Sequence, residues 1–168
     1  MRTRLIYFTV FSVIIFSCVK QSSSNPVPVI GFEDFKNAGK KSNGNDTATL
    51  VLSYEDGDGD LFLDDVANGP NLIFTAYYFN KSKNVFDAPH LPNPPPNTLD
   101  DTLKYSASII QPNNGYYKGK SIKGDIYVPL NEFRPDDNQK IIKFRGFMQD
   151  AKGHNSNWFS SPTITLNF

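Results

Sequence analysis

The stretch from Tyr54 to Leu61 holds the side chains in this sequence that are best suited to chemistry. Asp56, Asp58 and Asp60 alternate with glycine directly after an apolar, alternating segment. Calcium binds about six to eight hard oxygen atoms, and glycines between aspartates let the backbone curl until alternate carboxylates converge. The spacing therefore predicts calcium as the cofactor of this loop. The alternative is a solvated acidic turn, in which Asp and Gly only supply turn geometry.

The acidic loop does not follow the EF-hand pattern, because the sixth position counted from Asp56 is Leu61 and the twelfth is Ala67. Further ligands must therefore come from elsewhere in the chain. In an antiparallel sandwich the connections after every second strand gather at one end, which places the 150–157 loop beside the 55–70 loop. The predicted further ligands are Asp150, with Asp64 or Asp65 as spares.

The N-terminus has the pattern of an export signal. Arg2 and Arg4 precede an uncharged, mostly apolar run that is shorter than the roughly 20 residues a spanning helix needs. The single cysteine of the chain follows in a segment that resembles a bacterial lipobox, Ile15-Phe16-Ser17-Cys18. The resemblance implies a signal peptide over 1–17, an acylated Cys18 with a tether over 18–25, and a globular domain over 26–168.

The alternative is an ordinary signal peptide that is cleaved elsewhere, so that Cys18 is discarded. An acyl chain such as palmitate contributes about 0.8 kcal/mol per buried methylene, so multiple acylation of Cys18 would hold the protein stably at a membrane. A lone cysteine excludes intrachain disulfides, and the hydrophobic core must therefore hold the fold. Basic and acidic residues number 17 each, which gives no global field and predicts no nucleic-acid partner.

The sequence after residue 26 predicts an all-β chain, because apolar residues recur with a period of two and no helical periodicity is present. Pro26 and Pro28 place the first strand at a sheet edge. The segments 33–45 and 80–101 are predicted loops. The seven expected strands cover about 26–32, 46–54, 72–79, 102–110, 116–128, 142–149 and 163–168. This pattern predicts a single immunoglobulin-like antiparallel β-sandwich.

Two C-terminal segments resemble the last hairpin of bacterial Ig-like, cadherin-like and fibronectin-III-like domains: Phe147–Ser156 and Ser161–Leu166. Together with the lipobox and the acidic loop, they make the chain resemble small Ig-like lipoproteins of Bacteroidota. The resemblance implies a lipid-anchored protein at the outer membrane of the cell envelope. Its implied role is that of an interaction or accessory subunit with an envelope protein as partner.

No serine-hydrolase, zinc-protease or phosphate-binding motif occurs in the sequence, and we expect no enzymatic activity. The alternative function is a surface glycan-binding lipoprotein that stacks sugars on exposed aromatic rings. Adjacent aromatic residues on a strand point to opposite faces, so one member of each pair is expected in the core. The candidate pairs are Tyr77-Tyr78, Tyr116-Tyr117 and Trp158-Phe159.

Two short Asp-Thr-aliphatic segments resemble the O-glycosylation acceptor pattern of exported Bacteroidota proteins. They make Thr47 and Thr102 candidate O-glycosylation sites at the expected junctions between loop and strand. His90 and His154 lie in separate expected loops, and we interpret them as surface residues and not as zinc ligands.

Overall fold

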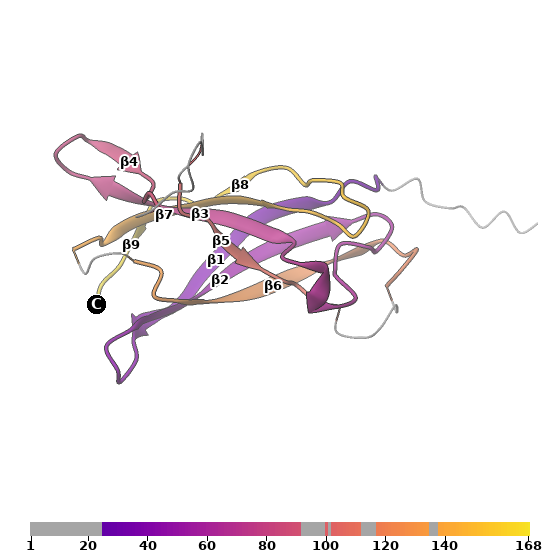
Figure 1. The fold of residues 1–168 in the computed structure, drawn as a ribbon, viewed down its shortest axis with the longest axis horizontal. Coiled ribbons are helices and arrows are strands. Elements are labelled where there is room, and N and C mark those ends of the chain that lie inside the picture. The colour runs from indigo at the N-terminus through magenta and orange to yellow at the C-terminus, as the bar shows by residue number, and fades with distance from the viewer. Residues whose placement is uncertain (1–24, 92–99, 101, 112–116, 135–137) are drawn as a thin grey trace, which may run out of the picture.

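The computed structural model describes residues 25–91, 100, 102–111, 117–134 and 138–168 (Figure 1). The predicted signal peptide, Cys18 and nearly all of the tether lie outside these residues. No helix in the described part of the chain has the length and apolar character needed to cross a membrane. The elements are β1 (Val29–Lys40), β2 (Asp46–Asp56), the 3-10 turn η1 (Val66–Asn68), β3 (Leu72–Asn80), β4 (Val85–Asp87), β5 (Tyr105–Ala107), β6 (Ile122–Asn131), β7 (Ile141–Met148), β8 (Phe159–Ser160) and β9 (Ile164–Thr165).

The strands form two antiparallel sheets. The first sheet has the order β1-β2-β6, and the second has the order β4-β3-β7-β8, with β5 also paired to β3 and β9 paired to β7. The prediction of an all-β antiparallel sandwich is confirmed, although the described residues form nine strands where the sequence indicated about seven. The two additional strands are β4 and β8, which are too short for a period of two to be visible.

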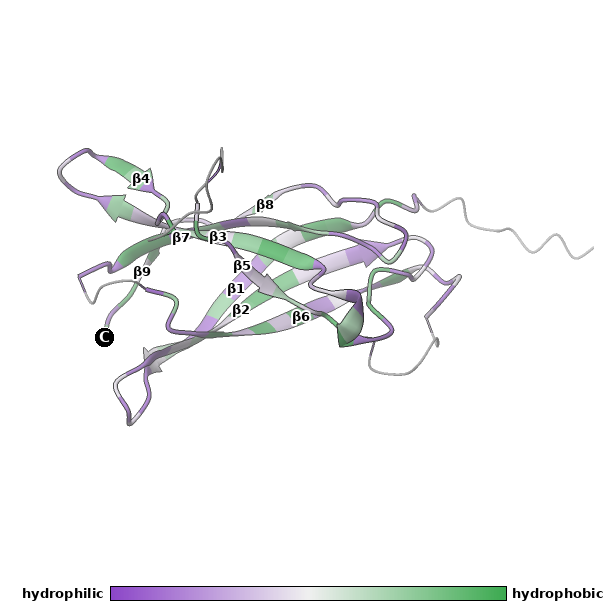
Figure 2. Cartoon of the chain, viewed as in Figure 1, coloured by the Kyte–Doolittle hydropathy of each residue, from purple (hydrophilic) through white to green (hydrophobic). Residues whose placement is uncertain are grey.

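The core lies between the sheets and is built from one face of each strand. Figure 2 shows apolar residues alternating with polar ones along β6, and Leu50, Leu52 and Phe144 in the core are completely buried. Phe35 stacks on Phe144 with ring centroids 5.5 Å apart, and Phe133 packs edge-on against Phe35. Burying one such side chain contributes about 1.5–3 kcal/mol, so this core can hold a fold that has no disulfide.

The first strand is longer than the sequence predicted. The 33–45 segment was expected to be a loop, yet β1 continues to Lys40 and stays paired with β2. Bulges between Phe32 and Asp34 and between Lys36 and Gly39 interrupt the alternation of side chains, which is why the pattern did not indicate a strand. The predicted edge position is confirmed, because β1 pairs only with β2.

Four further predictions of loop and strand bounds were wrong in part. The 80–101 segment contains a hairpin partner, β4, because Asn80 Oδ1 accepts hydrogen bonds from the amides of Ser82 and Lys83 and closes a tight turn after β3. The expected strand at 102–110 is reduced to β5, and the last expected strand is reduced to β9. The strand expected at 116–128 is β6, which begins six residues later and ends at Asn131.

A buried ion pair closes the end of the sandwich at which β2 begins. Arg134 donates from Nε and Nη2 to the two carboxylate oxygens of Asp46 at 2.6 Å each, and Phe168 covers the guanidinium. Lys40 Nζ lies 3.6 Å from the same carboxylate. The two hydrogen bonds and the Phe168 ring compensate for the burial of both charges. The pair thereby links the loop after β6 and the C-terminus to the start of β2.

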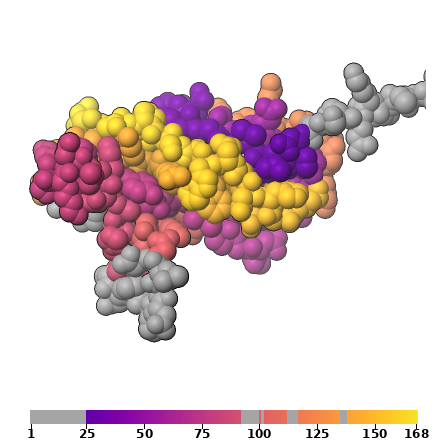
Figure 3. All heavy atoms as spheres, turned by 90° about the horizontal axis from the view of Figure 1, so that it is seen from above, coloured from indigo at the N-terminus to yellow at the C-terminus, as the bar shows by residue number. Residues whose placement is uncertain are grey.

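The opposite end of the sandwich gathers the start of the described chain and the acidic loop. Val29 at the start of β1 pairs with Glu55, next to the last residue of β2 (Figure 1). The C-terminal segment runs beside β1, as the yellow and indigo atoms show in Figure 3. Asn157 fixes this contact, because its side chain exchanges two hydrogen bonds of 2.8 Å with the backbone of Ile30.

Candidate metal centre

Asp56 shapes the acidic loop from within. It is the last residue of β2 and is 1% exposed. Its Oδ2 accepts hydrogen bonds from the amides of Asp60 at 2.9 Å and Leu61 at 3.1 Å, which bends the chain back over the carboxylate. Its other oxygen, Oδ1, is buried and has no hydrogen-bond partner. The turn therefore holds the Asp56 side chain so that Oδ2 accepts two hydrogen bonds and Oδ1 accepts none.

Gly59 allows this loop to lie against the 117–120 turn. Its φ is +72°, and a Cβ at this position would lie 1.9 Å from the carbonyl oxygen of Tyr117 and 2.6 Å from that of Lys120. Asp58 is held on the same side, since its carbonyl accepts a 2.6 Å hydrogen bond from the amide of Gly119. Only glycine fits both the conformation and the space.

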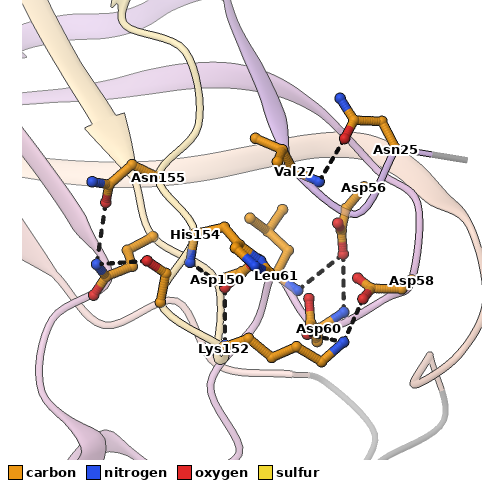
Figure 4. A network of polar contacts seen from close by, with 12 residues as sticks. Asn25, Val27, Asp56, Asp58, Asp60, Leu61, Asp150, Lys152, His154 and Asn155 are labelled. Atoms are coloured by element: carbon orange, nitrogen blue, oxygen red, sulfur yellow. Dashed lines mark hydrogen bonds and ion pairs between the residues drawn. The ribbon is translucent and has the colours of Figure 1, made fainter.

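Three carboxylates converge at this end of the sandwich (Figure 4). Asp56, Asp58 and Asp60 each offer an oxygen atom, and these three atoms lie within 4.8 Å of one another. Two oxygens bound to one calcium ion are separated by at most about 5 Å, twice the usual Ca–O distance. The Oδ1 atoms of all three residues are buried without a hydrogen-bond partner. Such atoms are costly to leave unsatisfied, and a bound cation would satisfy them.

The hairpin between β7 and β8 supplies a cationic side chain to the same loop. Lys152 Nζ lies 2.5 Å from Asp58 Oδ2 and 3.0 Å from Asp60 Oδ2. The amide of Ala151 donates to the carbonyl of Asp60 at 2.9 Å. The prediction that the loops 55–70 and 150–157 meet at one end is therefore confirmed.

Asp150 lies in this hairpin but is not one of the three converging carboxylates. It is 4% exposed, and its Oδ1 accepts from the amides of Lys152 at 2.9 Å and His154 at 2.8 Å. Its Oδ2 contacts His154 Nδ1 at 2.7 Å. Its carboxylate thus holds the hairpin turn in shape, and its role as a fourth calcium ligand stays a prediction.

The electrostatics of the site follow from burial and from the crowding of charge. Burial raises the pKa of Asp56, and repulsion from Asp58 and Asp150 adds to that shift. The pKa of Asp60 is also raised, by burial and by both neighbouring carboxylates, against the attraction of Lys152. Burial opposes ionisation of Asp58 as well, but its hydrogen bond and attraction to Lys152 outweigh burial and lower its pKa. One lysine therefore does not neutralise three carboxylates.

The remaining candidate residues lie away from the cluster. Asp64 and Asp65 are exposed, and the Asp65 side chain caps η1 by accepting from the amide of Ala67. Thr47 is half-buried inside β2 and is paired on both sides, while Thr102 is half-buried beside His90. Thr47 is the second residue of β2 and so lies at the expected junction between loop and strand, and modification of either threonine stays a prediction.

Sequence reasoning missed Lys152 and the 117–120 turn. The lysine follows Asp150 by two residues, and that proximity was the available signal, because a hairpin that carries one site residue carries its neighbours too. The turn gave no such signal, since it contributes only backbone atoms.

A comparison of the chain with protein-family models, with curated proteins and with solved structures found no match. The site must therefore be interpreted from its own geometry.

Proposed function

We propose that this protein is a non-enzymatic, lipid-anchored protein of the outer membrane whose acidic loop binds calcium. It acts as an interaction or accessory subunit of an envelope assembly. The observation that supports the metal is the trio of buried, unpartnered Oδ1 atoms on Asp56, Asp58 and Asp60. Calcium supplies the positive charge and the coordination that these oxygens lack.

The place of the loop in the fold suggests what the ion does. The loop contacts the β7–β8 hairpin through Ala151 and Lys152, and it contacts the 117–120 turn through Asp58. An ion bound by the acidic loop would therefore restrict the motion of three connections at once: the loop itself, the β7–β8 hairpin and the 117–120 turn. A rigid loop end is a suitable platform for a partner, because little entropy is lost when the partner binds.

The proposed anchor is close to this platform. Six residues lie between Cys18 and Asn25, and an extended chain from one to the other spans at most about 25 Å. Asn25 leads within four residues into Val29, which pairs with Glu55 at the acidic end. The calcium end would therefore face the membrane surface or a membrane-bound partner.

Two experiments test this function. Calorimetric titration of the full chain with calcium should show binding, and Asp58→Ala should weaken it, with Asp64→Ala as the exposed control in the same loop. An absence of binding heat in the wild type would reject the calcium site. Membrane fractionation tests the anchor, since Cys18→Ala should release the protein into the soluble fraction. Retention of that variant at the membrane would reject acylation.

A second candidate function, glycan binding, is favoured by the exposure of Trp158. The expected alternation is present here, because Phe159 is 2% exposed and belongs to the core, whereas Trp158 is 57% exposed. Tyr78 is likewise buried and Tyr77 half-buried, and Tyr116 lies outside the described residues. An exposed tryptophan directly before β8 offers a flat apolar surface of the kind on which sugars stack.

A further inference from the structure

We propose that the outer face of the second sheet binds an acidic polysaccharide through Lys143, Arg145 and the aromatic rings beside them. This inference rests on the glycan-binding function, to which it gives a site and a class of ligand. It depends neither on the calcium site nor on the membrane anchor.

The face is organised along β7. Ile142, Phe144 and the other inward residues of this strand are buried, which turns Lys143, Arg145 and Phe147 outward. Residues two apart on a strand lie on one face about 6.6–6.8 Å apart. The two cations therefore form a short row at the centre of the sheet.

Each cation lies against an aromatic ring. Lys143 Nζ is 4.5 Å from the ring centroid of Phe86, and the guanidinium carbon of Arg145 is 4.9 Å from that of Trp158. Phe147 supports Trp158 from the side, with ring centroids 4.9 Å apart. Such contacts hold long side chains in place without neutralising their charge.

Few acidic side chains lie on the strands around these cations. β3, β7, β8 and β9 contain neither Asp nor Glu, and Asp87 of β4 is already paired with Asn80 and Lys83. Within the described residues neither Lys143 nor Arg145 forms an ion pair, and each of them contacts an aromatic ring. Arg145 is exposed and is placed to receive a carboxylate or sulfate group, which it binds through two parallel hydrogen bonds. The charge of this face is therefore complementary to an anion.

Backbone pairing favours a polysaccharide over a peptide. β7 is paired with β3 on one side and with β8 and β9 on the other, so its backbone offers no free edge for an added strand. Recognition must come from ring faces and cations alone. An acidic sugar matches both, because its ring stacks on Trp158 while its acid group meets Arg145. Figure 3 shows the C-terminal segment exposed along the molecule on this side.

The test uses the full chain in detergent, with EGTA present so that calcium plays no part. Calorimetry should show binding of polygalacturonate and none of neutral dextran. Arg145→Gln, Lys143→Gln and Trp158→Ala should each weaken it about tenfold, the effect of losing one charge-assisted or stacking contact. Tyr127→Ala and Lys123→Gln are matched controls, because both residues are exposed on the outer face of the first sheet. Thermal melts identify any variant that has lost its fold, and Arg145→Gln changes only an exposed side chain.

Three results would overturn the inference. They are unchanged binding by Arg145→Gln and Lys143→Gln, equal binding of dextran, and binding of polyglutamate as tight as that of polygalacturonate. The last would indicate an acidic peptide. Because calcium is absent throughout, failure of the calcium proposal does not alter these results.

Discussion

The ammonium group of Lys152 lies 2.5 Å from Asp58 Oδ2, beside the three converging carboxylates of the acidic loop. The pKa of Lys152 is raised by its hydrogen bonds to Asp58 and Asp60, so it stays charged at neutral pH. The protein thus has an internal cation that would compete with a bound calcium ion for two of the three carboxylates.

Lys152→Met should raise the calcium affinity about tenfold, because it removes a charge only a few ångströms from the site. Without calcium the same variant should melt at a lower temperature, since the carboxylates then repel one another without relief. Calorimetry and thermal melts in EGTA measure the two effects. Lys123→Met, an exposed lysine on β6, is the control and should change neither. Equal calcium affinity in wild type and Lys152→Met would show that no competition takes place.

Asp56→Asn should abolish calcium binding and should leave the calcium-free protein at least as stable as the wild type. The amide oxygen can still accept from the amides of Asp60 and Leu61, while the charge is lost. At 100-fold excess over its Kd, calcium should stabilise the wild type by about 2.7 kcal/mol and the variant not at all. Chemical denaturation with and without calcium measures both. A calcium-dependent shift in the variant would contradict the assignment.

The pH dependence of this effect has a definite sign. Because the pKa of Asp56 is raised in the folded protein, the native state holds the proton more tightly than the unfolded chain does. This group therefore favours folding at low pH and opposes it as pH rises from about 4 through the raised value. In Asp56→Asn that contribution is gone, so over this range the calcium-free stability of the variant should rise with pH relative to that of the wild type. A fall of the variant relative to the wild type as pH rises would contradict the shift.

Gly59→Ala should destabilise the protein by about 2–3 kcal/mol, because the new methyl group meets the carbonyl oxygens of Tyr117 and Lys120 in addition to the backbone strain. Gly69→Ala is the matched control. Its φ of +84° is similar, but nothing lies within 4 Å of the added Cβ, so it should cost only about 1–2 kcal/mol. Denaturation midpoints measure the loss of stability in each variant. Equal losses in Gly59→Ala and Gly69→Ala would mean that the added methyl group at position 59 does not clash with the 117–120 turn.

Arg134→Met should destabilise the fold by about 3–5 kcal/mol, because it leaves the buried Asp46 carboxylate without its bidentate partner. The double variant Asp46→Asn/Arg134→Met should recover a large part of that loss, since no uncompensated charge remains. Urea denaturation of both variants measures the difference. If the double variant were as unstable as the single one, packing of the arginine stem and not charge would dominate at this end.

The sequence by itself determined the sandwich, the edge position of β1, the bounds of β3 to within a residue and the meeting of the 55–70 and 150–157 loops. These features follow from local rules. Apolar residues that recur with a period of two show which face of a strand is buried. Because successive strands alternate in direction, every second connection lies at the same end of the sandwich. The short β4 inserted between expected strands left that parity intact, since β4 and β5 both run antiparallel to β3.

Only the tertiary structure decided which side chains lie at the candidate metal site. Asp150 turned inward to its own hairpin, because the amides of Lys152 and His154 are nearer partners than a distant loop. Lys152 contacts the carboxylates because the hairpin that carries it packs against the acidic loop. Trp158 is exposed because the neighbouring Phe159 points into the core. Contacts between segments some 90 residues apart depend on the placement of both, and no local pattern in either segment encodes that placement.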